Sequence, residues 1–161
     1  MDRRQFAFAV VNAIAAVVKA FLVVIDDRTI LGEPLWMKPF KFFISAALLS
    51  LSLSYLVPRI SKGPRTTRIA SITIVVCLTV ELVLITSAAA AETTSHFNVS
   101  SPAATAVWSA MAWLITVVWF ATMVLTVMFI RSPGVDQVMK RAFTWGLVVS
   151  IAGMGVAFLM T

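Results

Sequence analysis

The sequence predicts an all-α protein, a bundle of helices that cross a membrane several times. Apolar residues make up 60% of the 161 residues, against roughly 45–50% in soluble globular proteins. Charged residues make up only 12%, and the mean hydropathy is +0.97. A soluble domain of this length could not bury so much apolar surface. The composition also excludes the disordered, coiled-coil, collagen-like and disulfide-rich secreted classes.

Five segments are long and apolar enough to cross a bilayer, which takes about 20 residues each. Together they make one transmembrane domain, residues 1–161, with spans at residues 6–25, 39–57, 69–91, 103–130 and 142–160. The first span is too long for a signal peptide, and no soluble domain follows it. The sequence stops at the end of the fifth span. We therefore expect either a helix that ends flush with the interface or the N-terminal part of a longer architecture.

Turn and capping residues place the helix boundaries. Pro39 and Pro102 lie in the first turn of their predicted helices, where a missing N–H costs nothing. Ser101 is a suitable N-cap for the fourth helix. Residues 62–64 (Lys-Gly-Pro) and 132–134 (Ser-Pro-Gly) are typical of turns.

The basic residues predict the orientation. Nine of the thirteen Lys and Arg residues fall near span ends that share one side: Arg3, Arg4, Arg59, Lys62, Arg65, Arg68, Arg131, Lys140 and Arg141. Only Arg28, Lys38 and Lys41 fall on the other side. The side richer in Lys and Arg faces the cytoplasm, so we expect the N-terminus inside and the C-terminus outside. Topology thus explains the net charge of +6, and we expect the lipid bilayer, not nucleic acid, as partner.

Single copies of cysteine and histidine limit the chemistry. Cys77 is the one cysteine, so an intrachain disulfide is impossible. His96 is the one histidine, which excludes sites that need two histidines from one chain. We expect no metal ion and no cofactor.

Two charged residues fall deep inside predicted spans. Lys19 is 13 residues from Phe6 and Glu81 is 13 residues from Arg68, which places each about 20 Å from the cytoplasmic side. An unpaired charge at that depth is costly. We therefore expect Lys19 and Glu81 to form an ion pair between helices, as a functional site or as a structural bridge.

More polar residues fall toward the outer side. Ser45 is expected near the depth of Lys19 and Glu81, as part of a polar layer or as a small residue that lets helices pack closely. Lys38, Lys41, His96 and Asn98 are expected at the outer surface. Such a group could transfer protons or bind an anion. Alternatively, it forms a hydrated rim in which the lysines reach lipid phosphates.

Two motifs resemble those of a known family. Lys-Pro-Phe-Lys-Phe at residues 38–42, preceded by Asp-Arg-Thr at 27–29, and Ser-His-Phe-Asn at 95–98 resemble signatures of a family of uncharacterised bacterial multi-pass integral membrane proteins. Family members commonly carry further spans after the fifth. The resemblance implies an inner (cytoplasmic) membrane location and a shared pattern that includes Lys38, Lys41, Ser45, Glu81, His96 and Asn98.

These observations predict a protein with an outward-facing polar site inside the membrane, for transport of a small solute or protons or for sensing a ligand. Its expected binding residues are Lys19, Lys38, Lys41, Ser45, Glu81, His96 and Asn98. One alternative is an enzyme at the outer leaflet with His96 as general base, the one candidate catalytic residue. Another is a non-catalytic subunit of a membrane assembly. The candidate protein partners are a second copy of the chain and another membrane protein.

Overall fold

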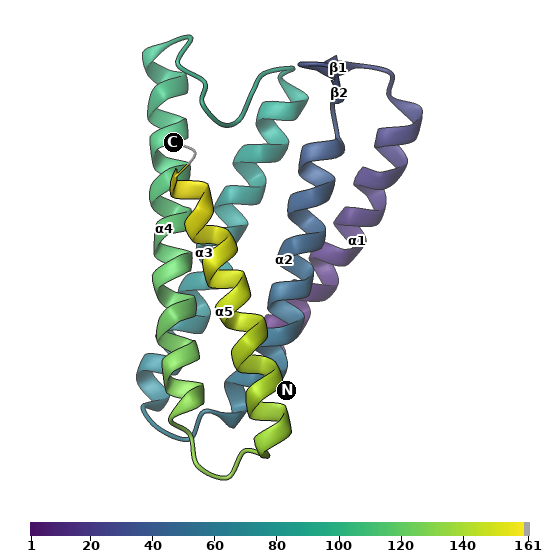
Figure 1. Ribbon diagram of the computed structural model, residues 1–161. Coiled ribbons are helices and arrows are strands. Elements are labelled where there is room, and N and C mark those ends of the chain that lie inside the picture. Colours follow the sequence, from purple (N-terminus) through teal and green to yellow (C-terminus); the bar gives the residue numbers. More distant parts are fainter. Residues whose placement is uncertain (160–161) are drawn as a thin grey trace.

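The computed structural model describes residues 1–159, and in this range it is an all-α bundle (Figure 1). Its helices are α1 (Arg3–Ile25), α2 (Met37–Leu56), the short 3-10 helix η1 (Val57–Arg59), α3 (Pro64–Ala90), α4 (Pro102–Ile130) and α5 (Gln137–Leu159). Helices α1 to α4 are long and apolar enough to cross a membrane, which agrees with the predicted membrane-protein class. The predicted end of the fifth span, at residue 160, lies outside the described residues.

The helix boundaries follow the predicted turn signals. Pro64 and Pro102 are the first residues of α3 and α4, and Ser101 Oγ accepts a hydrogen bond from Ala104 N at 3.1 Å as an N-cap. Gly63 precedes α3 with a φ of +63°, in the left-handed region that favours glycine. Helix α3 starts five residues before the predicted span, because its first turns are polar but still helical.

Helix α1 packs against α2 along its length. The buried face of α1 repeats at helical spacing through Gln5, Ala9, Asn12 and Ala16. Small residues such as Ala46, Ala47 and Ser50 are buried on α2. Small side chains let two helices approach closely, which drives association in lipid.

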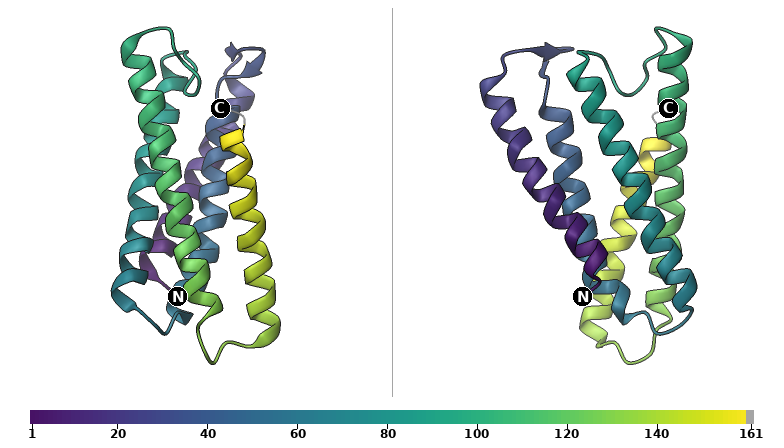
Figure 2. Two further views of the ribbon diagram at one scale, coloured as in Figure 1. Left: turned by 60° about the vertical axis from the view of Figure 1, so that its left-hand side comes forward. Right: turned by 180° about the vertical axis from the view of Figure 1, so that it is seen from behind.

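The pair α1–α2 and the pair α3–α4 lie close at one end of the bundle and diverge toward the other. We call the first end the basic end, because it carries the nine predicted cytoplasmic Lys and Arg residues. Here Gln5 Nε2 of α1 donates to Ser71 O and Oγ of α3, both at 3.0 Å. Fully buried Leu53, Ile74 and Phe129 belong to the main apolar core. Figure 2 shows α1 tilting away from α3 toward the opposite end, while α5 lies against α4.

We call that opposite end the loop end, because two structured connections cover it. Strands β1 (Thr29–Ile30) and β2 (Glu33–Pro34) form a small antiparallel hairpin between α1 and α2, with Thr29 opposite Pro34. The second connection, residues 91–101, joins α3 to α4 and dips back between them (Figure 1).

A sharp reversal at the end of α3 causes this dip. Thr93 N donates to Ala88 O at 3.0 Å and Glu92 N donates to Ala89 O at 2.9 Å. This is the helix-ending pattern that usually needs glycine, because its turning residue has a positive φ. Here Glu92 takes that place with a φ of 54°.

Candidate functional site

Glu81 is a carboxylate buried inside the bundle. It lies on α3, nine residues before the helix ends at Ala90, and only 2% of the residue is exposed. Its Oε1 lies 3.8 Å from His96 Nε2, and its Oε2 has no hydrogen-bond partner among the described residues. A buried charge without compensating contacts is strongly unfavourable. Such a carboxyl group is therefore a functional candidate. Its charge depends on whether it binds a proton, and its nearest titratable neighbour is His96.

The dipping connection brings His96 to Glu81. Phe97, which follows His96, has a φ of 57° and packs on Trp108 of α4 at a ring distance of 5.4 Å. The His96 ring packs on Phe42 of α2 at 5.8 Å. Its Nδ1 lies 3.1 Å from Ser95 Oγ. These contacts fix the imidazole between α2 and α3, with one nitrogen toward a hydroxyl and the other toward Glu81.

A cavity of about 360 Å³, lined by both apolar and polar residues, lies beside His96 at the loop end. Residues from the β1–β2 hairpin, the start of α2, the end of α3 and the 91–101 connection line it. The polar side chains among them are Glu33, Lys38, Thr93, Thr94, Ser95 and His96. Glu81 is not in this lining, so His96 connects the cavity to the buried carboxyl group.

The surroundings of His96 keep its ring neutral at physiological pH. Burial, together with the charge of the nearby Lys38 ammonium, lowers the pKa of His96 to about 4 from 6.5. A neutral imidazole has one N–H donor and one acceptor nitrogen. It can therefore accept a proton on one side and release one on the other.

An ionic network ties the two connections of the loop end together. Arg28 donates through Nε and Nη2 to the two carboxylate oxygens of Asp26, and through Nη1 to Glu92 Oε1 at 2.7 Å. Trp36 Nε1 also donates to Asp26, at 2.7 Å. The Arg28 and Trp36 hydrogen bonds hold the pKa of Asp26 well below its usual range. Arg28 thus links the segment after α1 to the segment after α3.

The expected ion pair between Lys19 and Glu81 is wrong. Lys19 Nζ lies 4.3 Å from the centre of the Trp36 ring, whereas the imidazole of His96 is the group that lies 3.8 Å from Glu81. Helix α1, which carries Lys19, tilts away from α3, which carries Glu81, toward the loop end (Figure 2). The expectation rested on similar residue counts along the two helices, and such counts do not determine the lateral distance between the helices.

The structure brings three of the predicted binding residues together, Lys38, Glu81 and His96. Lys41 Nζ instead lies 3.5 Å from Glu33 Oε2, with both side chains exposed. Ser45 Oγ donates to Lys41 O at 2.8 Å and lines a different cavity, between α2 and α5. Asn98 supports the connection: its Nδ2 donates to Thr93 Oγ1 at 2.8 Å.

Sequence reasoning missed two parts of the site. The first is Ser95, whose position next to His96 in the Ser-His-Phe-Asn motif was a usable signal. The second is the link from Arg28 to Glu92, which are 64 residues apart. No local pattern marks that contact, because it depends on how the two connections fold over the bundle.

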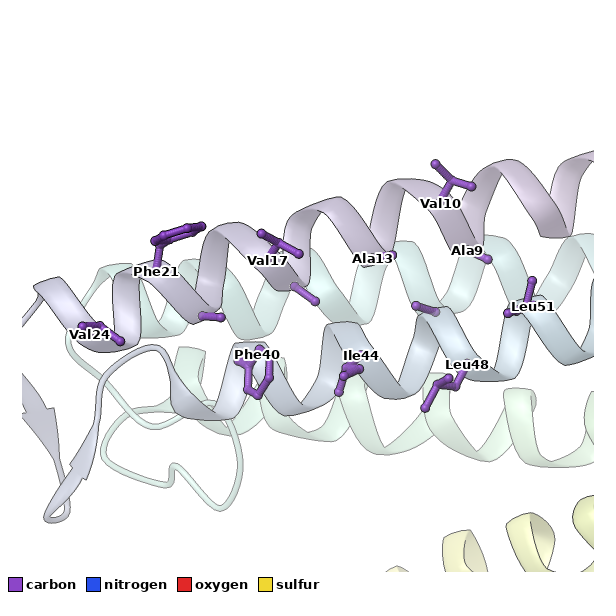
Figure 3. Close-up of a pocket in the computed structure, with 13 residues that line it drawn as sticks. Ala9, Val10, Ala13, Val17, Phe21, Val24, Phe40, Ile44, Leu48 and Leu51 are labelled. Carbon is purple, nitrogen blue, oxygen red and sulfur yellow. The ribbon is translucent and has the colours of Figure 1, made fainter.

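A larger cavity, about 700 Å³, lies between α1 and α2 (Figure 3). Its lining is formed by apolar side chains only, such as Val17, Phe21 and Ile44. It offers no group for acid–base or ion chemistry, so the polar cavity beside His96 is the candidate site. Within residues 1–159 no three His, Cys, Asp or Glu side chains are grouped so that they could hold a metal ion.

Comparison with known protein families, with curated proteins and with solved structures finds no match. The resemblance in the two sequence motifs therefore has no independent support. The function has to be argued from the geometry of the site.

Proposed function

We propose that the protein is a five-span protein of the bacterial inner membrane with its loop end outside. The support is the distribution of charge, since nine basic residues lie at the basic end and three near the loop end. Helix α5 has 23 residues, enough to cross about 30 Å of hydrocarbon. In this orientation the polar cavity opens toward the outer solution.

The function that the site supports best is the movement of protons between the outer solution and Glu81. The observation that carries this proposal is the 3.8 Å contact between Glu81 Oε1 and His96 Nε2. His96 lines the cavity on one side and contacts the buried carboxyl group on the other. Proton exchange of this kind serves transport coupled to protons or the sensing of outer pH.

The chain of atoms gives the path. Ser95 Oγ, which lines the cavity, lies 3.1 Å from His96 Nδ1. A proton that arrives at Nδ1 allows the proton on Nε2 to leave for Glu81 Oε1, so the imidazole relays charge without holding it for long. The positive charge of Lys38 at the cavity wall favours the neutral ring.

Infrared difference spectroscopy after a pH jump tests the proposal on the full chain in lipid nanodiscs. We expect a carboxylic-acid band that disappears in Glu81→Gln. The band should remain in the control Glu92→Gln, which removes an exposed carboxylate at the same end. His96→Asn should slow the change of the band by roughly 100-fold, the range of a positioned proton donor or acceptor. A band that persists in Glu81→Gln, or an unchanged rate in His96→Asn, would contradict the relay.

One observation favours an enzyme as a second candidate. The hydroxyl of Ser95 beside the neutral imidazole of His96 is an arrangement that can activate a hydroxyl or a water molecule. Lys38 in the same cavity could hold the phosphate of a lipid headgroup. This candidate requires that the protein convert phospholipids in vesicles into products visible by mass spectrometry, and that His96→Ala stop this. If the wild-type protein leaves the lipids unchanged, the enzyme hypothesis is excluded.

A further inference from the structure

A second polar cavity lies at the basic end, far from His96. It has a volume of about 380 Å³ and is formed where the starts of α1 and α3 meet η1. Three of its lining residues are arginines: Arg3 and Arg4 from α1 and Arg68 from α3. Two helices that begin at Arg3 and Pro64 thus direct basic residues to one place.

The charge of these arginines is not compensated by the protein. Among the described residues, no carboxylate oxygen lies within 4.0 Å of the Arg3, Arg4 or Arg68 guanidinium groups, since the four ion pairs involve other side chains. Asp2 is the one acidic residue in the lining. Its Oδ1 already accepts hydrogen bonds from Arg4 N at 3.1 Å and Gln5 N at 2.9 Å, where it caps α1. The cavity therefore keeps an excess of positive charge.

The rest of the lining combines two hydroxyl residues, Thr67 and Ser71, with apolar residues. Val57 and Ile60 are buried beneath the cavity, and Pro58 and Pro64 complete its wall. Arginines pair well with phosphate oxygens, and apolar walls suit the glycerol and first methylene groups of a lipid. The cavity also lies where spanning helices end, at the level of lipid headgroups.

We propose that this cavity binds the phosphate of an anionic membrane phospholipid through Arg3, Arg4 and Arg68. Basic cavities between membrane helices on the cytoplasmic side are a known form of lipid site. This proposal is separate from proton exchange at Glu81, because the two sites lie at opposite ends of the bundle. Neither depends on the other.

Native mass spectrometry of the full chain, titrated with phosphatidylglycerol, tests the proposal. The site variant is Arg3→Gln/Arg4→Gln/Arg68→Gln, which leaves the backbone contacts of Asp2 intact. The matched control is Lys62→Gln/Arg131→Gln/Arg141→Gln, which removes the same charge from the same end but touches none of the lining. Circular dichroism confirms that each variant is folded. If the site variant does not fold, Arg68→Gln alone is compared with Arg131→Gln.

The expected result is a loss of phosphatidylglycerol affinity of about 100-fold in the site variant, or roughly five-fold for Arg68→Gln alone. In each control variant, the change in the logarithm of the dissociation constant should be less than about a third of the change in the corresponding site variant. Equal losses in site and control variants would overturn the proposal, since they show general attraction to a basic surface. Equal affinity for phosphatidylcholine would also overturn it. Displacement by millimolar inorganic phosphate would assign the site to free phosphate and overturn the lipid assignment.

Discussion

The low pKa of His96 gives a prediction that can be measured on a single side chain. His96 is the only histidine in the sequence, so an NMR titration with labelled histidine reports on this ring alone. Burial and the charge of Lys38 lower its pKa from 6.5 to about 4. We therefore expect a titration midpoint near pH 4 for the folded protein in nanodiscs, and one near 6.5 after unfolding in strong detergent.

The same difference sets a dependence of stability on pH. Above pH 6.5 the ring is neutral in both states, so the free energy of unfolding has its full value. Between pH 6.5 and about 4 the unfolded chain binds a proton that the folded protein does not, so the free energy of unfolding falls as the pH falls. The total loss from this one group is about 3 kcal/mol. His96→Asn should be insensitive to this part of the pH range, relative to the wild type.

A pair of lysine variants separates the two causes. Lys38→Met removes the nearby positive charge and should move the midpoint of His96 upward, but not fully to 6.5, because burial is the larger cause. Lys41→Met is the control, since Lys41 lies by Glu33 and outside the cavity lining. A midpoint at or above 6.5 in the wild-type protein would refute the reasoning. It would mean that Glu81 stabilises the charged ring more than burial destabilises it.

Two further predictions concern a strained turn and the apolar core. Gly63→Ala should lower the free energy of unfolding by about 1–2 kcal/mol, because a side chain in the left-handed region is strained and its Cβ would lie 2.8 Å from Met128 Cε. Gly146→Ala has open space and should cost less than half as much in the same detergent-unfolding assay. Leu53→Ala, at 0% exposure, should cost about 1–3 kcal/mol through lost packing, whereas the same change at lipid-facing Leu48, 60% exposed, should stay near zero.

The helices could be predicted from the sequence because their signals are local. An apolar run of about 20 residues has few alternatives to a membrane helix, and Pro39 and Pro102 lie in the first turns of α2 and α4, as predicted. The orientation and the fifth span stay predictions. The depth of Lys19 and Glu81 was also a local inference, since it needs only a count of residues along each helix.

The composition of the site could be predicted only in part, because it depends on helix tilt and on one connection. Lys19 was placed beside Glu81 on depth alone, and the tilt of α1 separates them. His96 reaches Glu81 because Glu92 and Phe97 adopt positive φ angles that turn residues 91–101 inward. Neither residue is a glycine, so the sequence carried no sign of these turns.

Because the two helix pairs diverge toward the loop end, we expect the surrounding bilayer to influence the shape of the site. The cavity beside His96 has one wall on α2 and the β1–β2 hairpin and another on α3 and the 91–101 connection. Its width therefore follows the angle between the pairs, which the link from Arg28 to Glu92 restrains on one side only. We expect lateral pressure in the leaflet at the loop end to act on that angle. Bilayer thickness and lipid shape then become variables that set how easily water reaches the histidine.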